Sequence, residues 1–220
     1  MSFNSETYFE IKKSSDKHHA KLAVVTKYVG VEEIEEAFEV GARVFAENKS
    51  KDALIKKTEL NQAILDRTEW HFIGHLQSNK VKDVVGNFKL IHSIDSIKLA
   101  NAVNLAAQHK NLIQDVLIQI NISEEEAKSG FSKEQIREVF SELIKMTSIS
   151  IQGFMAVALN TTDETKLRKQ FQELREIKES IESEFKVKLP ELSMGMSNDY
   201  QIALDEGATI IRIGHILFNK

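Results

Sequence analysis

The stretch LAVVTKYVGVEEIEEAFEVGARVFAE, residues 22–47, shows the pattern from which the fold can be predicted. A short apolar run at 22–26 is followed by a segment at 31–41 that mixes Glu with apolar residues, and a second apolar run covers 43–47. Short runs of this kind indicate buried strands, whereas apolar residues three and four positions apart indicate one face of a helix. Gly41 is a typical signal for the end of that helix. The stretch therefore predicts strand, helix and strand, the unit of a parallel α/β fold.

The same alternation continues through the rest of the chain. Short runs rich in Val, Ile and Phe are separated by longer amphipathic segments, without a linker rich in Pro, Gly or Ser. The eight predicted strands cover 22–26, 43–47, 70–74, 90–94, 116–122, 151–157, 191–195 and 209–214. Eight parallel strands with intervening helices close into a (β/α)8 TIM barrel, which typically needs about 250 residues. The 220 residues are therefore expected to form one barrel domain over 1–220.

Helix signals complete this prediction. Only HILFNK follows the eighth strand, so the closing helix is missing, and residues 5–19 are expected to form an extra N-terminal helix that covers the gap. In the segment 132–146, Ser132 and Gln135 have the spacing of a capping box. The predicted fold is thus a single TIM barrel with an extra N-terminal helix.

Composition excludes several classes of protein. The net charge of -4 comes from acidic and basic residues mixed along the chain, so no extended basic face for nucleic acid is expected. The chain has no cysteine, which rules out disulfides and cysteine-ligated zinc, and no cluster of histidines and carboxylates predicts another metal site. The apolar runs are too short to cross a membrane, and the start MSFNSETYFEIKK lacks the apolar core of a signal peptide. A cytoplasmic protein is expected.

Polar residues and methionine stand where the predicted strands end. Active sites of TIM barrels lie at the C-terminal ends of the strands, so these side chains are expected to converge there. They are Lys27, Asn48, His75, Asn121, Met155, Ser197, Arg212 and Gly214.

Lys27 supports two interpretations. A lysine beside a turn is commonly the solvated end of a strand. At the mouth of an apolar barrel, however, loss of water and a nearby Arg212 would both favour the neutral amine, which can attack an aldehyde. Schiff-base chemistry at Lys27 is therefore plausible.

The segment LSMGMSNDYQIALDEGATIIRIGH, residues 192–215, predicts an anion site. Gly195 permits a close backbone approach, and Ser197 is expected to cap a helix beginning near Asn198, whose first amides would face an anion. Gly214 and His215 add further amides after the eighth strand, where barrels commonly bind phosphate. A capped helix and a close-packed glycine explain the same residues without a ligand.

These residues also carry a resemblance to a known family. VVTK at 24–27, FAEN at 45–48, EWHFIGHLQSNK at 69–80, VLIQINIS with KSGF, and residues 192–214 resemble the pyridoxal phosphate homeostasis protein family, also called the proline synthetase co-transcribed homologue family. The resemblance covers about Lys21 to Phe218. It implies a barrel like the barrel domain of alanine racemase, standing alone. It also implies that this chain, like the family, binds pyridoxal 5'-phosphate (PLP) without robust catalytic turnover.

The resemblance also implies roles for individual residues. Lys27 would form the internal aldimine with PLP, Arg212 would lie beneath the pyridine nitrogen, and Asn48 would lie near the polar edge of the ring. The phosphate would be held by Ser197 and by the backbone at Gly214 and His215. Met155 either packs against the ring or is a core methionine. His71 and His75 either line the mouth or are structural histidines.

Four features depart from the family pattern. Thr26 replaces the usual serine, and YVG follows the lysine in place of Thr-x-Pro. Ala46 replaces a glycine, which restricts the backbone there. His215 replaces a threonine, so that a hydroxyl ligand for the phosphate is lost.

Arg212 indicates a carrier or regulator rather than an enzyme. Arginine only donates hydrogen bonds, so it keeps the ring nitrogen unprotonated and weakens the electron sink that carbanion chemistry needs. The second domain that supplies a base in alanine racemase is not encoded before the chain ends at Lys220. The expected partners are PLP and apo PLP-dependent enzymes, and a monomer or weak homodimer is expected. A low-activity racemase or lyase using Tyr28 or Tyr200, and an aldolase using Lys27 without PLP, remain alternatives.

Overall fold

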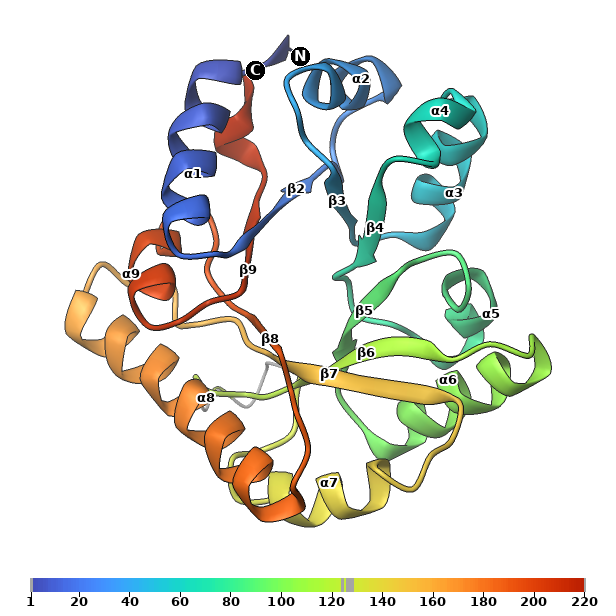
Figure 1. Ribbon diagram of the computed structural model, residues 1–220, viewed down its shortest axis with the longest axis vertical. Coiled ribbons are helices and arrows are strands. Elements are labelled where there is room, and N and C mark those ends of the chain that lie inside the picture. The colour runs from blue at the N-terminus through green and yellow to red at the C-terminus, as the bar shows by residue number, and fades with distance from the viewer. Residues whose placement is uncertain (1, 124, 126–128, 220) are drawn as a thin grey trace.

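Eight parallel strands close into a barrel in the computed structural model, as the sequence predicts (Figure 1). The structure describes residues 2–123, 125 and 129–219. The acidic run at 123–128, expected to be a solvated loop, therefore lies mostly outside the described residues. The barrel strands are β2 (Lys21–Val25), β3 (Val44–Glu47), β4 (Glu69–Phe72), β5 (Leu90–Ile94), β6 (Gln114–Gln119), β7 (Ile149–Met155), β8 (Glu191–Ser193) and β9 (Ile210–Ile213).

Helices surround the barrel (Figure 1). The α-helices that follow the strands are α2 (Val31–Glu39), α3 (Ser50–Glu59), α4 (Gln62–Leu65), α5 (Val81–Val84), α6 (Ile97–His109), α7 (Ile136–Leu143), α8 (Glu164–Phe185) and α9 (Tyr200–Asp205). Short 3-10 helices occupy η1 (Ser78–Lys80) and η2 (His215–Leu217). Ser132 and Gln135 exchange the two capping-box bonds as predicted, at 3.4 and 3.3 Å, although α7 begins only at Ile136.

An N-terminal helix lies beside the last strand of the barrel. Helix α1 (Ser5–Lys17) lies beside β9 and the C-terminal residues, which confirms the expectation for residues 5–19 (Figure 1). The side chain of Asn4 caps it by accepting a bond from the Thr7 amide. A small antiparallel pair, β1 (Ser2–Phe3) with β10 (Phe218–Asn219), joins the two ends of the chain.

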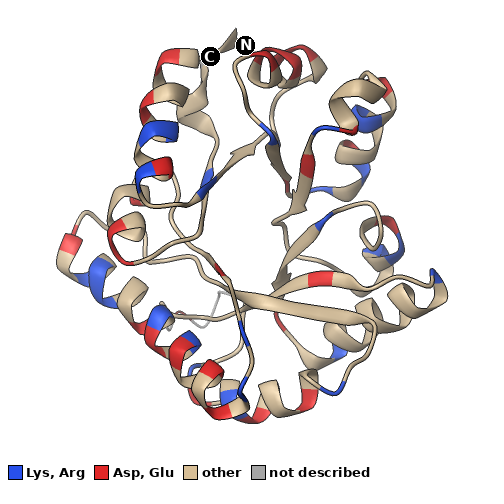
Figure 2. Cartoon of the chain, viewed as in Figure 1, with Lys and Arg blue, Asp and Glu red and all other residues tan. Residues whose placement is uncertain are grey.

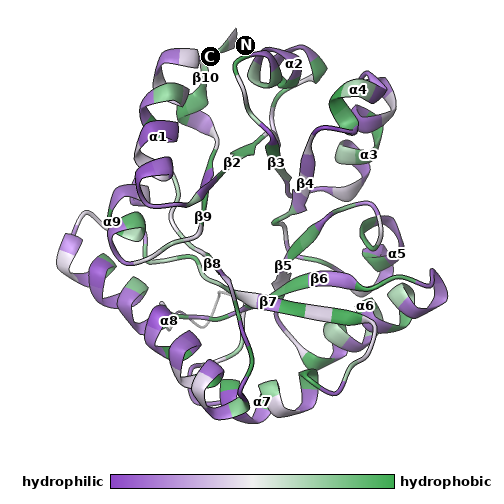
Figure 3. Ribbon diagram, in the orientation of Figure 1, coloured by the Kyte–Doolittle hydropathy of each residue, from purple (hydrophilic) through white to green (hydrophobic). Residues whose placement is uncertain are grey.

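Apolar residues form two clusters, one on each side of the strands. The larger cluster fills the layer between strands and helices, and Figure 3 shows the apolar strands surrounded by helices with hydrophilic outer faces. The smaller cluster fills the barrel interior with Ala23, Val25, Ala46, Leu90, Leu117, Met155 and Ile210. Alternate residues of a strand face opposite sides of the sheet. The residues two positions after an interior residue on the same strand are therefore expected to face the interior as well, and we call them the inward-facing series.

Some predicted strands extend past the last residue of the observed ladder. The prediction 116–122 ends three residues beyond β6, and 151–157 ends two residues beyond β7. The apolar pattern follows burial rather than pairing: Ile120 and Ile122 stay buried after the regular strand has ended.

Charged side chains lie mainly on the outer helices. Acidic and basic residues are mixed along α1 and α8, whereas all the charged residues of α2 are acidic (Figure 2). Among the described residues, no helix has the length and apolar character needed to span a bilayer.

Candidate functional site

The inward-facing series leads directly to several predicted site residues. Ala23 and Val25 face the barrel interior, and Lys27 is the next residue with the same parity. Asn48 follows Ala46 in the same way on β3. The C-terminal ends of the strands therefore carry these side chains to the mouth of the barrel.

Lys27 is half-buried, and its amine has no acceptor among the described residues. Its Nζ lies 4.7 Å from the centroid of the Tyr28 ring, which is 73% exposed. Among the described residues, no carboxylate lies within ion-pair distance of this amine and no hydrogen bond reaches it. The amine is thus available to an external group.

A buried cluster fixes the turn before Lys27. Thr26 Oγ1 donates to Glu47 Oε1 at 2.8 Å, and Lys56 Nζ donates to the same oxygen at 2.6 Å and to the Thr26 carbonyl at 2.7 Å. The Thr26 amide donates to the Ala46 carbonyl at 3.0 Å. Sequence reasoning missed Glu47 and Lys56 as supporting residues, although Glu47 belongs to the FAEN motif.

Two polar atoms of the β3 end have no partner. Glu47 Oε2 and Asn48 Oδ1 are buried without a hydrogen bond in the described part of the chain. Gly74 packs so closely here that a Cβ on it would lie 2.1 Å from the Asn48 carbonyl oxygen. The Asn48 backbone is therefore held by a close approach that only glycine permits, while its side-chain oxygen can accept a hydrogen bond from a ligand.

Arg212 is a buried cation on β9. Its NH1 donates to Ser193 Oγ at 2.6 Å and its NH2 donates to the Ala156 carbonyl at 2.9 Å. Burial lowers the pKa of this guanidinium to about 10, and the charge of Asp199 acts in the opposite direction. Of the five N–H groups of an arginine, three make no hydrogen bond to a described residue and can serve an acceptor on a ligand.

The loop between β8 and α9 differs from its prediction. Ser197 does not cap the helix: α9 begins at Tyr200, and the side chain of Ser197 makes no hydrogen bond to a described residue. Asp199 orders the loop instead, because its Oδ1 accepts the Met196 amide at 2.6 Å. Burial raises the pKa of Asp199, against the effect of that bond and of Arg212. The amides of Ser197 and Asn198 have no acceptor within the described residues.

Gly214 and His215 follow β9 as expected. A Cβ on Gly214 would lie 3.2 Å from Val25 Cβ, so this glycine permits close packing of β9 against the end of β2. His215 is exposed at the first position of η2, and its amide donates to no described residue.

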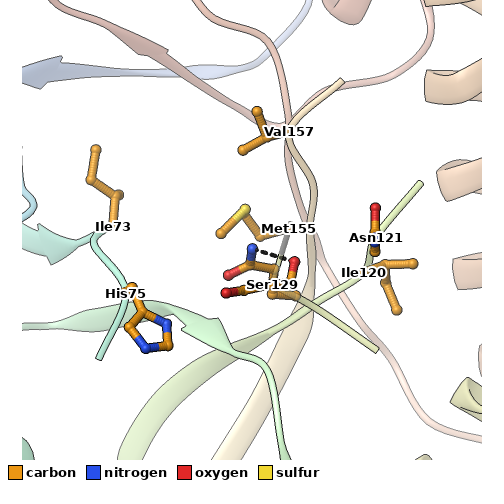
Figure 4. Close-up of a pocket in the computed structure, with 8 residues that line it drawn as sticks. Ile73, His75, Ile120, Asn121, Ser129, Met155 and Val157 are labelled. Carbon is orange, nitrogen blue, oxygen red and sulfur yellow. Dashed lines mark hydrogen bonds between the residues drawn. The ribbon is translucent and has the colours of Figure 1, made fainter. Parts of the chain in front are cut away.

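A cavity of about 210 Å³ opens on the opposite side of the mouth. Met155 extends into the space between Ile73 and Val157, and His75 and Asn121 lie at its rim (Figure 4). Met155 is 3% exposed and belongs to the interior cluster, so it is both a core residue and part of the cavity wall.

The two histidines of the WHFIGH segment have different surroundings. His71 is buried and bonded within the barrel, so it is a structural histidine and does not line the mouth. His75 is exposed, and its Nδ1 lies 3.1 Å from Asp95 Oδ2. Among the described residues, no group of three or more histidines and carboxylates is arranged to hold a metal.

Comparisons with known proteins identify the family. The model for the alanine racemase N-terminal domain matches residues 6–220. A pyridoxal phosphate homeostasis protein of Aquifex aeolicus is 40% identical over 201 residues, covering 91% of this chain and 87% of the relative. This chain belongs to the pyridoxal phosphate homeostasis protein family. Its Synechocystis relative of the same name is 37% identical over 198 residues, with 90% of each chain covered.

Solved structures of other proteins have the same fold as this chain. PipY of Synechococcus elongatus, solved with PLP bound, has a TM-score of 0.84 and 31% identity, covering 91% of this chain and 93% of its own. Alanine racemase of Clostridium difficile has a TM-score of 0.79 over 100% of this chain and 58% of its own. At 16% identity the second likeness shows the fold alone.

One departure from the pattern of the pyridoxal phosphate homeostasis protein family is compensated by local structure. The resemblance predicts a serine at position 26, and the hydroxyl of Thr26 makes the buried bond to Glu47. At His215 the hydroxyl of the family threonine is absent, and only an imidazole and a backbone amide are present.

Proposed function

We propose that this chain binds PLP at the mouth of its barrel, with covalent attachment to Lys27, and acts in PLP and amino-acid homeostasis rather than as an enzyme of high turnover. The observation that carries the proposal is a pair of side chains: the Lys27 amine, which has no hydrogen bond or ion pair among the described residues, and the buried Arg212, whose remaining N–H groups can donate to a ligand. Both belong to the inward-facing series of adjacent strands, β2 and β9. Residues 1–220 act as one PLP-binding unit in this proposal.

The residues at the mouth fit the chemical groups of PLP. The aldehyde needs an amine, which Lys27 supplies, and the unprotonated pyridine nitrogen needs a donor, which Arg212 supplies. The phosphate needs donors, and the amides of Ser197 and His215 have no other acceptor among the described residues. Asn48 Oδ1 is a buried oxygen without a partner, suited to a donor on the polar edge of the ring. Met155 supplies apolar contact from the cavity wall.

The same residues favour holding PLP over transforming a substrate. When bound, PLP supplies an electron sink, and this sink is strongest when the ring nitrogen is protonated. Arg212 is a donor, so the nitrogen next to it must accept and stay unprotonated. Strong carbanion stabilisation is therefore not expected at this site.

A low-activity racemase or lyase is the second candidate. The observation that favours it is the contact of the Tyr28 ring with the Lys27 amine at 4.7 Å, which brings a phenol close to the reacting position. Deuterium incorporation from D2O at the α-carbon of a panel of amino acids, compared between wild type and Tyr28→Phe, separates the candidates. A carrier exchanges little deuterium in either protein.

The proposed attachment is tested by adding PLP, reducing with borohydride and locating the adduct by peptide mass analysis. Wild type should carry one pyridoxyl phosphate group on Lys27, and Lys27→Ala should carry none. The matched control is Lys49→Ala, because Lys49 is an exposed lysine near the same mouth. Adducts spread over surface lysines, or an unchanged yield in Lys27→Ala, would refute the proposal.

Transfer of PLP to apo PLP-dependent enzymes is the partner interaction that we propose. A loaded chain should activate such an apo-enzyme faster than its own spontaneous release of PLP allows. A cytoplasmic location, where these enzymes act, and a monomer or weak homodimer belong to the same proposal.

A further inference from the structure

A chain of polar side chains crosses the barrel interior behind Arg212. Arg212 NH1 lies 2.6 Å from Ser193 Oγ, which lies 2.8 Å from His92 Nδ1. His92 Nε2 lies 3.1 Å from His71 Nδ1, and His71 Nε2 lies 3.6 Å from Glu69 Oε2. Ser193 and His92 are fully buried, whereas Glu69, at the start of β4, is half-exposed. The chain therefore joins the candidate site to the N-terminal end of the barrel.

Arg212 fixes the direction of every bond in this chain. An arginine only donates, so Ser193 Oγ must accept, and the serine proton then goes to His92 Nδ1. His92 consequently carries its proton on Nε2 and donates it to His71 Nδ1. His71 likewise carries its proton on Nε2, where it faces the Glu69 carboxylate. Each group donates to the next, from guanidinium to carboxylate.

The reverse direction is disfavoured by chemistry. It would leave the Ser193 proton without an acceptor among the described residues. With a neutral His71, it would also turn the bare lone pair of Nε2 towards the Glu69 carboxylate. Both results cost free energy in a buried site, because unpaired polar atoms there are expensive.

The surrounding charges keep His92 in the neutral form that this chain requires. Burial is the largest cause that lowers the pKa of His92 well below its ordinary value, and the charges of Arg212 and Lys21 act in the same direction. At the other end, the hydrogen bond from His71 lowers the pKa of Glu69, and Lys21 and Lys89 assist. Glu69 therefore remains an acceptor.

We propose that Ser193 and His92 are positioning residues for PLP, which hold the Arg212 guanidinium as a donor to the pyridine nitrogen. Ser193 occupies one N–H group of NH1 and the Ala156 carbonyl occupies one of NH2, so the plane of the guanidinium is set by two fixed bonds. His92 acts through Ser193, and His71 and Glu69 fix the tautomer of His92. The inference rests on the proposed PLP site.

The affinity test compares two buried serines. Ser193→Ala removes the hydroxyl that orients Arg212, whereas Ser93→Ala removes a buried hydroxyl of β5 that has no hydrogen-bond partner in the described part of the chain. In PLP titrations followed by absorbance, Ser193→Ala should bind about tenfold more weakly, and Ser93→Ala should bind like wild type. The absorbance spectrum of bound PLP should shift in Ser193→Ala alone, because the hydrogen bond to the ring nitrogen changes. Equal affinity and an unshifted spectrum in Ser193→Ala would overturn the proposal.

Two variants of His92 test its role as a positioning residue. In His92→Asn, the side-chain oxygen can replace Nδ1 and accept from Ser193, so most of the PLP affinity should be retained. His92→Leu removes that acceptor and should bind about as weakly as Ser193→Ala. If both variants bind equally, His92 has only a packing role and the proposal fails.

A measurement without PLP keeps this inference separate from the proposed function. Nitrogen-15 NMR of the PLP-free wild-type protein should show both His92 and His71 as Nε2–H tautomers. A proton on Nδ1 of His92 would overturn the inference even if PLP binds. Absence of a Lys27 adduct in wild type would instead refute the proposed function, whatever the tautomers are.

Discussion

Thr26 Oγ1 donates a buried hydrogen bond of 2.8 Å to Glu47 Oε1, and the next residues along the two strands are Lys27 and Asn48. The bond thus joins the ends of β2 and β3 directly beneath two candidate ligands of PLP. Lys56 completes the cluster from α3 with a bond of 2.6 Å to the same carboxylate oxygen. The positions of Lys27 and Asn48 therefore depend on a buried ion pair that contacts neither of them.

Lys56→Met should lower the free energy of unfolding by about 3 kcal/mol. Glu47 is fully buried, and loss of one partner of a buried pair leaves an uncompensated charge, which costs about 3–5 kcal/mol. Urea unfolding measures the change. Lys49→Met is the matched control: the Lys49–Asp52 pair is exposed and 3.9 Å long, so its loss should cost less than about 0.5 kcal/mol. Equal effects of the two substitutions would show that Glu47 is not held as described.

The free energy of unfolding should decrease as the pH falls below about 7, because the buried His92 resists protonation in the folded state. Burial lowers its pKa in the folded state, whereas the unfolded chain binds a proton near pH 6.5. Between these two values the unfolded state binds more protons, so the free energy of unfolding decreases by up to about 1.4 kcal/mol for each pH unit lost.

The measurement compares urea unfolding at about pH 7 and about pH 5 in wild type and His92→Asn. Wild type should lose more free energy of unfolding than the variant over this range. His109→Gln, at the exposed end of α6, should behave like wild type. If His92→Asn shows the full wild-type loss, another group is responsible for the pH dependence.

The sequence predicted most of the fold and part of the site, for identifiable physical reasons. The eight strands were recognisable because each contains a short, largely buried apolar run. Lys27 was recognisable because it directly follows such a run, and Arg212 because it interrupts one. The role of Lys56 could not be recognised from the sequence. Its partner Glu47 lies nine residues away in sequence, and only the turn from β3 into α3 brings the two side chains together. The function of His92 depends on β4, β5, β8 and β9 meeting inside the barrel, which no local pattern specifies. Ser197 was assigned as a cap because serine is a favoured N-cap residue. In the structure α9 begins only at Tyr200, and Asp199, two residues after Ser197, orders the loop by accepting the Met196 amide.

The fluorescence of Trp70, the only tryptophan of the sequence, should depend on the protonation state of Lys57. Its Nζ lies 5.0 Å from the Trp70 ring centroid and 4.9 Å from that of Phe88, and it donates to the Asn87 carbonyl. Burial lowers the pKa of Lys57 to about 8. The fluorescence of Trp70 should therefore change with a midpoint near pH 8, as the cation over the indole ring loses its charge.

Two substitutions check this assignment. Lys57→Met should abolish the transition, and Lys57→Arg should keep the low-pH fluorescence up to about pH 10, because arginine stays charged. A transition that persists in Lys57→Met would mean that another group alters the emission of Trp70.

His215→Thr should tighten PLP binding by about tenfold. The substitution restores the hydroxyl that the family places after Gly214, and one hydrogen bond to a charged group contributes about 1.5 kcal/mol. His215 is exposed, so its replacement should change the free energy of unfolding by less than about 0.5 kcal/mol. Titration with PLP and with pyridoxal, which lacks the phosphate, separates the causes. Only the affinity for PLP should improve. An equal gain for pyridoxal would place the effect at the ring or at Lys27, and no gain for PLP would mean that the phosphate lies out of reach of residue 215.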